Sequence, residues 1–116
     1  MKIIDKRSKI SNIELKIMAE TMFGELVKAV VDIEKELLVV DAELHADEEK
    51  ELLERGSKQE NLWGINLYPD DFGEDDFIEF DSMINLRPSW GNRSRGVDDV
   101  EIQAKIVLIV NNLIEE

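Results

Sequence analysis

Three arginines in a stretch without acids are the feature of this sequence best suited to binding chemistry. Residues 70–81 carry seven acidic side chains and no basic one. Residues 82–97 contain no Asp or Glu and hold three cations, Arg87, Arg93 and Arg95. A guanidinium group binds a phosphate or carboxylate through two parallel hydrogen bonds, where lysine offers only a point charge. The stretch therefore predicts a site for a small anionic ligand or for an acidic patch of a partner.

Further side chains of the same loop would add specificity to such a site. Amides, a hydroxyl and an indole lie among the arginines, at Asn85, Trp90, Asn92 and Ser94. Tryptophan is enriched in binding hot spots, so Trp90 could stack on a ligand or fold back over a sheet edge. The alternative interpretation is that the arginines pair with the chain's own surplus carboxylates, for example those of residues 70–76.

The only histidine, His45, is the candidate for catalysis. It follows a predicted strand and precedes Asp47, which we expect to cap a helix. Imidazole titrates near neutral pH, so His45 could act as the base of a small hydrolase or lyase, oriented by Asp47 or Glu43. A histidine that merely forms a hydrogen bond at a helix start is the alternative.

Metal and cofactor chemistry finds little support. The chain has no Cys and one His, so nitrogen and sulfur ligands are limited to His45. The acids of residues 70–76 do not follow the order of a calcium loop. No serine stands in a nucleophile elbow, and the arginine spacing matches no phosphate-binding loop. We therefore expect neither a metal nor a cofactor.

The length and net charge of the chain restrict its domain number and the kinds of partner that it can bind. The 116 residues fit one domain, and the formal charge of −13 repels phosphate backbones and anionic lipid surfaces. We therefore expect no nucleic-acid or membrane partner. No apolar run approaches the roughly 20 residues of a membrane span, and the N-terminus lacks a signal-peptide core. A cytoplasmic location is the expectation.

The first half of the chain contains signals for strands and helices in turn. Residues 2–6 form a short candidate strand, and Ser11 with Glu14 has the form of a capping box for a helix that Gly24 ends. Residues 26–44 alternate in two β-branched runs, which predicts a hairpin with a tight turn at residues 34–36. One long helix is the competing interpretation. Asp47 would cap the next helix, with Gly56 at its end.

In the second half, two alternating runs predict strands at residues 62–68 and 77–87. In the second of these runs, Ile78, Phe80, Ile84 and Leu86 would face the core, and Asn85 and Arg87 the opposite side. Asp98 or Asp99 would cap a C-terminal helix that is apolar over about half its circumference. Leu108 lies off that apolar face, which suggests a homodimer, although a deeply buried helix explains the same pattern.

These elements define the expected fold. Strands grouped as hairpins, with helices at the margins, indicate an α+β domain with an antiparallel or mixed sheet of about four to five strands. Two or three helices accompany the sheet, and the C-terminal helix packs on it. A single domain over residues 1–116 is expected.

Four segments carry a resemblance to a known family. They are residues 43–47, 61–69, 82–88 and 91–94, and the likeness extends over nearly the whole chain. The sequence resembles a family of short prokaryotic proteins that is catalogued only as a domain of unknown function. The resemblance implies one intact domain, and it brings no activity, ligand or catalytic residue with it.

Overall fold

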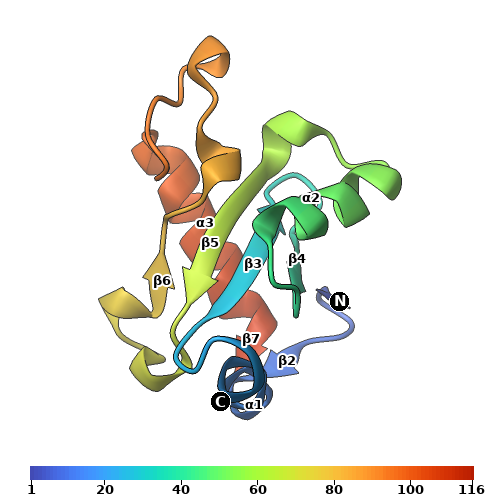
Figure 1. The fold of residues 1–116 in the computed structure, drawn as a ribbon, viewed down its shortest axis with the longest axis vertical. Helices are drawn as coiled ribbons and strands as arrows, with labels where there is room; N and C mark the ends of the chain where they lie inside the picture. The colour runs from blue at the N-terminus through green and yellow to red at the C-terminus, as the bar shows by residue number, and fades with distance from the viewer.

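A five-stranded sheet organises the computed structural model, which describes residues 1–116 (Figure 1). The strand order is β1–β4–β3–β5–β6, and every neighbouring pair is antiparallel. The bounds are Lys2–Ile4 for β1, Val27–Asp32 for β3, Leu37–Val40 for β4, Leu62–Leu67 for β5 and Ile78–Glu79 for β6. Together with three helices, this confirms the predicted α+β fold.

The hairpin of β3 and β4 is formed as predicted, so a single helix over residues 26–44 is wrong. Its turn contains no glycine and is stabilised instead by the Asp32 carboxylate. Asp32 Oδ1 accepts hydrogen bonds from the amides of Glu34 and Lys35 at 2.9 and 3.0 Å. Glu36 takes the left-handed conformation with φ 56°. A side-chain bond of this kind stabilises a turn without Gly or Asn.

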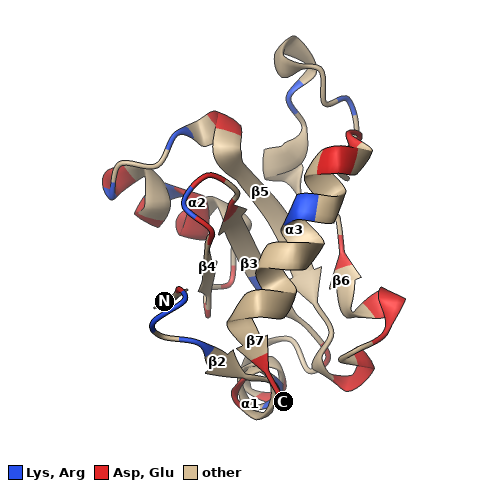
Figure 2. Cartoon of the chain, turned by 180° about the vertical axis from the view of Figure 1, so that it is seen from behind, with Lys and Arg blue, Asp and Glu red and all other residues tan.

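Helices cover both faces of the sheet (Figures 1 and 2). Helix α3, Val100–Leu113, packs on one face, where its Ile106, Ile109, Val110 and Leu113 join the main core. The second face is thinner, and α2, His45–Glu54, sets Leu52 against Val30, Val39 and Leu62. Alternation along the strands sends successive side chains to these two cores.

The end of the sheet that holds both chain termini is closed by α1, Asn12–Met22 (Figure 1). Ser11 Oγ accepts a hydrogen bond from the Glu14 amide at 3.2 Å, which confirms the predicted start of this helix. A short parallel pair, β2 (Ile10–Ser11) with β7 (Ile114–Glu115), lies beside α1 and was not predicted. Two-residue strands carry too little alternation to be seen in a sequence.

Helix α3 begins where its sequence predicts. Asp99 caps the helix by accepting a hydrogen bond from the Glu101 amide at 2.8 Å, as one of the two predicted caps. Val100 and Leu108 are exposed, so the apolar surface of the helix extends beyond its buried face. The association of this face with a second copy stays a prediction. No helix of the structure combines the length and apolarity that crossing a bilayer requires.

The strand predicted at residues 77–87 is wrong beyond Glu79. After β6 the chain turns at Ser82 into a 3₁₀ turn, Met83–Asn85. Asn85 takes the place of a neighbouring strand, because its side chain accepts from the Gly64 amide at 2.8 Å and donates to the Gly64 carbonyl at 2.9 Å. A Cβ on Gly64 would lie 2.5 Å from that of Ser82, so this close approach requires glycine.

The predicted facing is wrong at the end of this segment, whereas Ile78, Phe80 and Ile84 pack against the cores as expected. Asn85 is completely buried and Arg87 nearly so, whereas Leu86 is 41% exposed. The hydrophobic alternation predicted the opposite, because it counted Asn85 and Arg87 as surface residues. Their hydrogen bonds to backbone carbonyls explain their burial, since a buried polar group is tolerated when it is bonded.

Candidate functional site

His45 is the first residue of α2, so this helix begins two residues before the predicted cap. The N-cap residue is Leu44, which makes no side-chain cap, and Asp47 lies exposed in the first turn; its predicted capping role is wrong. Leucine is among the poorest N-caps, since it has no acceptor for the first amides. The amides of His45 and Ala46 have no hydrogen-bond acceptor in the chain. The α2 start is therefore an uncapped, positive helix end.

The imidazole of His45 is buried and fixed in one tautomer. Its Nε2–H donates to the Ile65 carbonyl oxygen at 2.7 Å. Because a carbonyl only accepts, the hydrogen must be on Nε2, and the neutral ring keeps a lone pair on Nδ1. Burial lowers the pKa of His45 below its usual 6.5, against a smaller opposing effect of the bond to Ile65, and the positive charge of Lys28 contributes to the lowering. Nδ1 has no partner within the chain.

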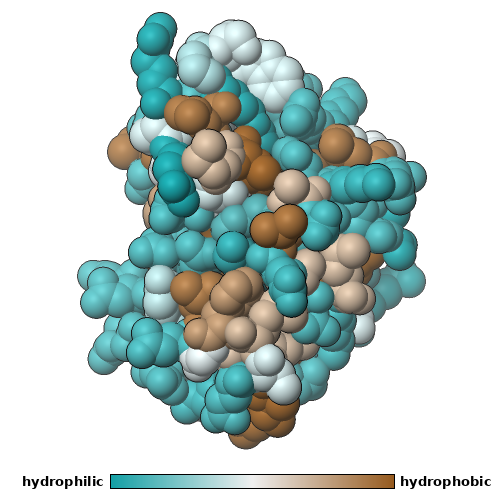
Figure 3. Space-filling model, in the orientation of Figure 1, coloured by the Kyte–Doolittle hydropathy of each residue, from teal (hydrophilic) through white to brown (hydrophobic).

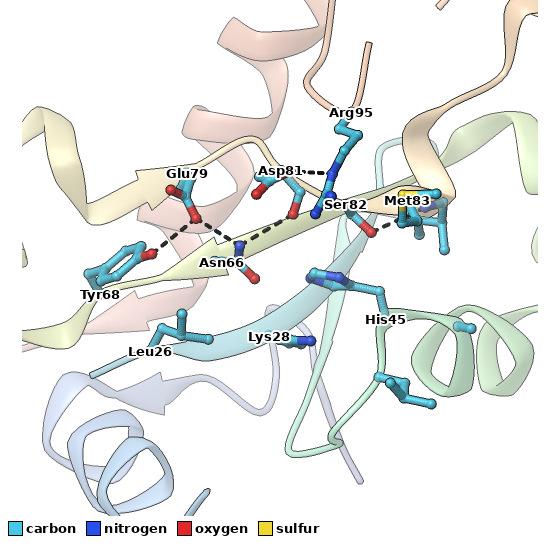
Figure 4. Close-up of a pocket in the computed structure, with 13 residues that line it drawn as sticks. Leu26, Lys28, His45, Asn66, Tyr68, Glu79, Asp81, Ser82, Met83 and Arg95 are labelled. Carbon is cyan, nitrogen blue, oxygen red and sulfur yellow. Dashed lines mark hydrogen bonds and ion pairs between the residues drawn. The ribbon is translucent and has the colours of Figure 1, made fainter. Parts of the chain in front are cut away.

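A cleft of about 500 Å³ opens beside His45. It is called the His45 cleft below, and its polar lining consists of Lys28, His45, Asn66, Tyr68, Glu79, Asp81, Ser82 and Arg95 (Figure 4). The exposed side chains of Leu44 and Met83 also line it. Apolar patches alternate with hydrophilic side chains on this face of the molecule (Figure 3). Most of the lining comes from β3, β5, the start of α2 and the segment after β5.

One wall of the His45 cleft is a chain of hydrogen bonds (Figure 4). Tyr68 donates its hydroxyl hydrogen to Glu79 at 3.0 Å, and Asn66 donates to the same oxygen at 2.8 Å. Asn66 also reaches the Asp81 carbonyl at 3.3 Å, and the Asp81 carboxylate pairs with Arg95 at 2.8 Å. Burial and the bond to Glu79 raise the pKa of Tyr68. These partners hold the acids of the cleft in place.

Lys28 is the unpaired cation of the His45 cleft. It is the one basic residue of the chain that is not exposed and has no carboxylate within 4.0 Å. Its Nζ lies 5.0 Å from the centroid of the Phe23 ring, a cation–π contact that leaves the ammonium hydrogens unpaired. In a chain of net charge −13, an unpaired and half-buried cation is unusual.

The structure separates the seven loop residues of the predicted anion site. Arg95 lines the His45 cleft and pairs with Asp81, whereas Arg87 is buried and pairs with Glu49 at 3.4 Å. The Arg93 side chain is exposed and has no ion-pair partner. Two of the three guanidinium groups therefore meet carboxylates of the chain itself, neither of them within residues 70–76. Lys16 instead approaches Asp70 in that segment, at 3.8 Å.

The loop is stabilised by internal hydrogen bonds from the side chains of Asn85, Asn92 and Ser94. Asn92 donates to the carbonyl oxygens of Asn85 at 2.7 Å and Gly96 at 2.9 Å, and it accepts from the Asp98 amide at 2.8 Å. Ser94 donates its hydroxyl hydrogen to Asp98, and this bond is the main cause of the lowered pKa of Asp98. Asn92 lines a second cleft together with Arg87 and Trp90.

Sequence reasoning did not find most of the His45 cleft. Lys28, Asn66, Tyr68, Glu79 and Asp81 were not among the candidates. Lys28 did carry a signal, since it is the only charge inside the run from Leu26 to Val31. The others come together only through the pairing of β5 with β6, where Asn66 lies opposite Glu79. Asp47 lies outside this cleft, and no hydrogen bond links it to the imidazole.

Comparison with known proteins identifies a family for this chain and no activity. No curated protein and no solved structure matches this chain. A family model described as "Protein of unknown function (DUF5674)" matches residues 2–113. That match spans nearly the whole length, and the chain belongs to the DUF5674 family.

Proposed function

We propose that the His45 cleft binds a small anionic molecule through a carboxylate or phosphate group. The observation that carries this proposal is Lys28, an ammonium group in the cleft that no carboxylate of the chain neutralises. A cation that is partly removed from water and unpaired costs free energy, and an anionic ligand recovers it. The anion site that the sequence predicted at the loop arginines is thus proposed at the His45 cleft instead. Arg95 is the one loop arginine that lines this cleft.

The helix start supports the same ligand class. The free amides of His45 and Ala46 and the positive end of α2 favour an anion at this position. Two acceptors on residues that line the cleft also lack partners, His45 Nδ1 and the buried Asn66 Oδ1. They would accept hydrogens from hydroxyl groups of the ligand. The lining therefore favours a molecule that carries both a negative group and a hydroxyl, such as a hydroxy acid or a protonated phosphate.

The single histidine provides a direct test. Because no other imidazole is present, the His45 ring C–H signals in a proton NMR spectrum report this cleft alone. We expect inorganic phosphate or small hydroxy acids to shift these signals saturably at low ionic strength. Lys28→Gln should weaken the binding at least about tenfold, the effect of about 1.4 kcal/mol. Lys105→Gln, which removes an exposed cation elsewhere, should leave it unchanged.

Two results would refute the proposal. One is a His45 signal that none of these anions moves at millimolar concentration. The other is equal weakening by Lys28→Gln and Lys105→Gln, because this would reduce the effect to the net charge of the molecule.

A second candidate function is general-base catalysis by His45 on the bound anion. The free Nδ1 of a neutral ring favours it, because such an atom can accept a proton from water or from the ligand. Ser82 is nearly fully buried, and its Oγ accepts from the Ile84 amide, so water is the better nucleophile for a hydrolase. His45→Gln can keep an N–H donor for Ile65 while removing the base. Turnover of any ester or phosphate that survives this change would exclude the role.

A further inference from the structure

A second cleft, of about 470 Å³, lies where β5 begins next to the N-terminal end of α3. Its lining includes both tryptophans of the chain, Trp63 and Trp90, and the buried Arg87. Three acids, Glu60, Asp98 and Asp99, also line it. We call it the tryptophan cleft. It shares no lining residue with the His45 cleft.

Two residues that line the tryptophan cleft carry hydrogen-bond donors without acceptors. Trp63 Nε1 and Arg87 Nη1 are buried and have no partner, in residues that are 6% and 9% exposed. The other nitrogens of Arg87 are used, because Nε donates to the Ile84 carbonyl at 2.9 Å and Nη2 to Leu62 and Glu49. An unsatisfied buried donor costs free energy, so an acceptor that reaches these two groups is favoured.

The acids of the tryptophan cleft restrict what can bring that acceptor. Glu60 and Asp99 have no basic partner within 4.0 Å, and Asp99 uses one oxygen to cap α3. Acidic residues gather at this end of α3 (Figure 2). Arg87 is already paired with Glu49 at 3.4 Å, so the surroundings are negative. A simple anion is repelled there, whereas a ligand with its own positive group is attracted.

We propose that the tryptophan cleft binds a small amine that also carries a carboxylate or carbonyl acceptor, and free amino acids are the simplest members of this class. The acceptor bonds to Trp63 Nε1 and Arg87 Nη1, and the ammonium group lies between Glu60 and Asp99. The Trp90 ring lies over Arg87, with its centroid 5.7 Å from the Arg87 Cζ atom. Because its ring lies over the Arg87 guanidinium, Trp90 turns aside to admit the ligand.

The exposure of Trp90 makes this movement inexpensive. Trp90 is 56% exposed and ends the 3₁₀ turn Pro88–Trp90, which is followed by the left-handed Gly91. The ring therefore gives up little buried surface when it leaves Arg87. Once moved, its π-face can cover the ligand's ammonium group in a favourable cation–π contact.

Intrinsic fluorescence tests this proposal, because both tryptophans of the chain lie in this cleft. Leucine and lysine, each with its N-acetyl derivative and its amide, are titrated at low ionic strength. Acetylation removes the α-ammonium charge, and the amide keeps the carbonyl acceptor. We expect a saturable change with the free amino acids and the amides, and binding at least tenfold weaker for N-acetylleucine. His45 signals should not move in the titrations with the amides, which carry no anionic group.

Paired variants test the residues. Glu60→Gln with Asp99→Asn should weaken binding about tenfold or more, and asparagine preserves the cap of α3. Asp76→Asn, an exposed acid elsewhere, is the matched control and should have no effect. The proposal is overturned if no amino acid or amide changes the fluorescence saturably at millimolar concentration. It is equally overturned if N-acetylleucine binds as tightly as leucine, or if the control weakens binding as much as the paired variant.

Discussion

The two clefts use consecutive acids of α2 in opposite ways. Behind the His45 cleft, burial raises the pKa of Glu48 to about 10, against a smaller opposing effect of Lys28. Glu48 is therefore a neutral acid at pH 7 and leaves Lys28 without a counter-charge. Behind the tryptophan cleft, Glu49 pairs with Arg87 at 3.4 Å. The His45 cleft keeps an unpaired cation, Lys28, beside its acid Glu79, whereas the tryptophan cleft keeps unpaired acids and no unpaired cation.

The ligand that a cleft attracts therefore depends on which charged side chains remain unpaired in the fold, more than on the charge of the local sequence. The sequence placed the positive charge around Arg87, Arg93 and Arg95. In the fold, Arg87 and Arg95 are paired, and the uncommitted cation of the clefts is Lys28, which comes from an apolar strand. Desolvation and hydrogen bonding decide which side chains are ionised and which of these are paired. Both depend on contacts between distant parts of the chain.

The largest expected effect separates the two paired loop arginines. Arg87→Ala removes the bonds to Ile84 and Leu62 and leaves Glu49 without its partner, so we expect a loss of about 3–5 kcal/mol in the free energy of unfolding. Arg95→Ala breaks an ion pair whose side chains are 56% and 43% exposed, and it should cost at most about 1 kcal/mol. Urea denaturation measures both. Equal losses would contradict the distinction between a structural and an available arginine.

Glu48→Gln tests whether the acid behind Lys28 is neutral. Because folding raises the pKa of Glu48 from 4.5 to about 10, its favourable contribution is complete below pH 4.5 and declines as the pH rises. Between pH 4.5 and 7 the loss from this group is on the order of 3 kcal/mol. Glu48→Gln should remove that part of the decline, so its stability relative to wild type should increase with pH.

Denaturation at several pH values measures this difference, with Glu54→Gln as the exposed control on the same helix. Neither oxygen of Glu48 makes a hydrogen bond, and the Ala42 amide lies near the carboxyl outside bonding geometry. A stability difference between Glu48→Gln and wild type that does not change with pH would show that Glu48 is ionised in the fold. Lys28 would then be neutralised, and the contrast between the clefts would disappear.

The fold could be predicted further than the site because its signals are local. The β3–β4 hairpin, the cap of α1 and the cap of α3 each depend on residues within one or two turns of chain. The segment after Glu79 departs from its alternation because Asn85 bonds to Gly64, which lies 21 positions earlier. No pattern within residues 77–87 contains that partner.

The site depended on the same kind of distant contact. His45 was found because a lone histidine is conspicuous, but its tautomer depends on Ile65, 20 positions away. Asp47 was chosen for its nearness in sequence, and helical geometry turns it to the surface while His45 and Glu48 face the sheet. Residues that meet across β5 and β6 gave no joint signal.

The smallest expected effect concerns His45 itself, and it runs opposite to that of Glu48. Because folding lowers the pKa of His45 below 6.5, its contribution to stability is complete above pH 6.5 and is lost as the pH falls through the folded value. His45→Gln should flatten this part of the profile, and NMR titration of the ring signals should give a midpoint below 6.5. Bound anion should raise that midpoint, because a negative charge beside the ring stabilises its protonated form. A midpoint above 6.5 in the free protein would mean that the fold favours the charged ring, in which Nδ1 has no lone pair with which to accept a proton.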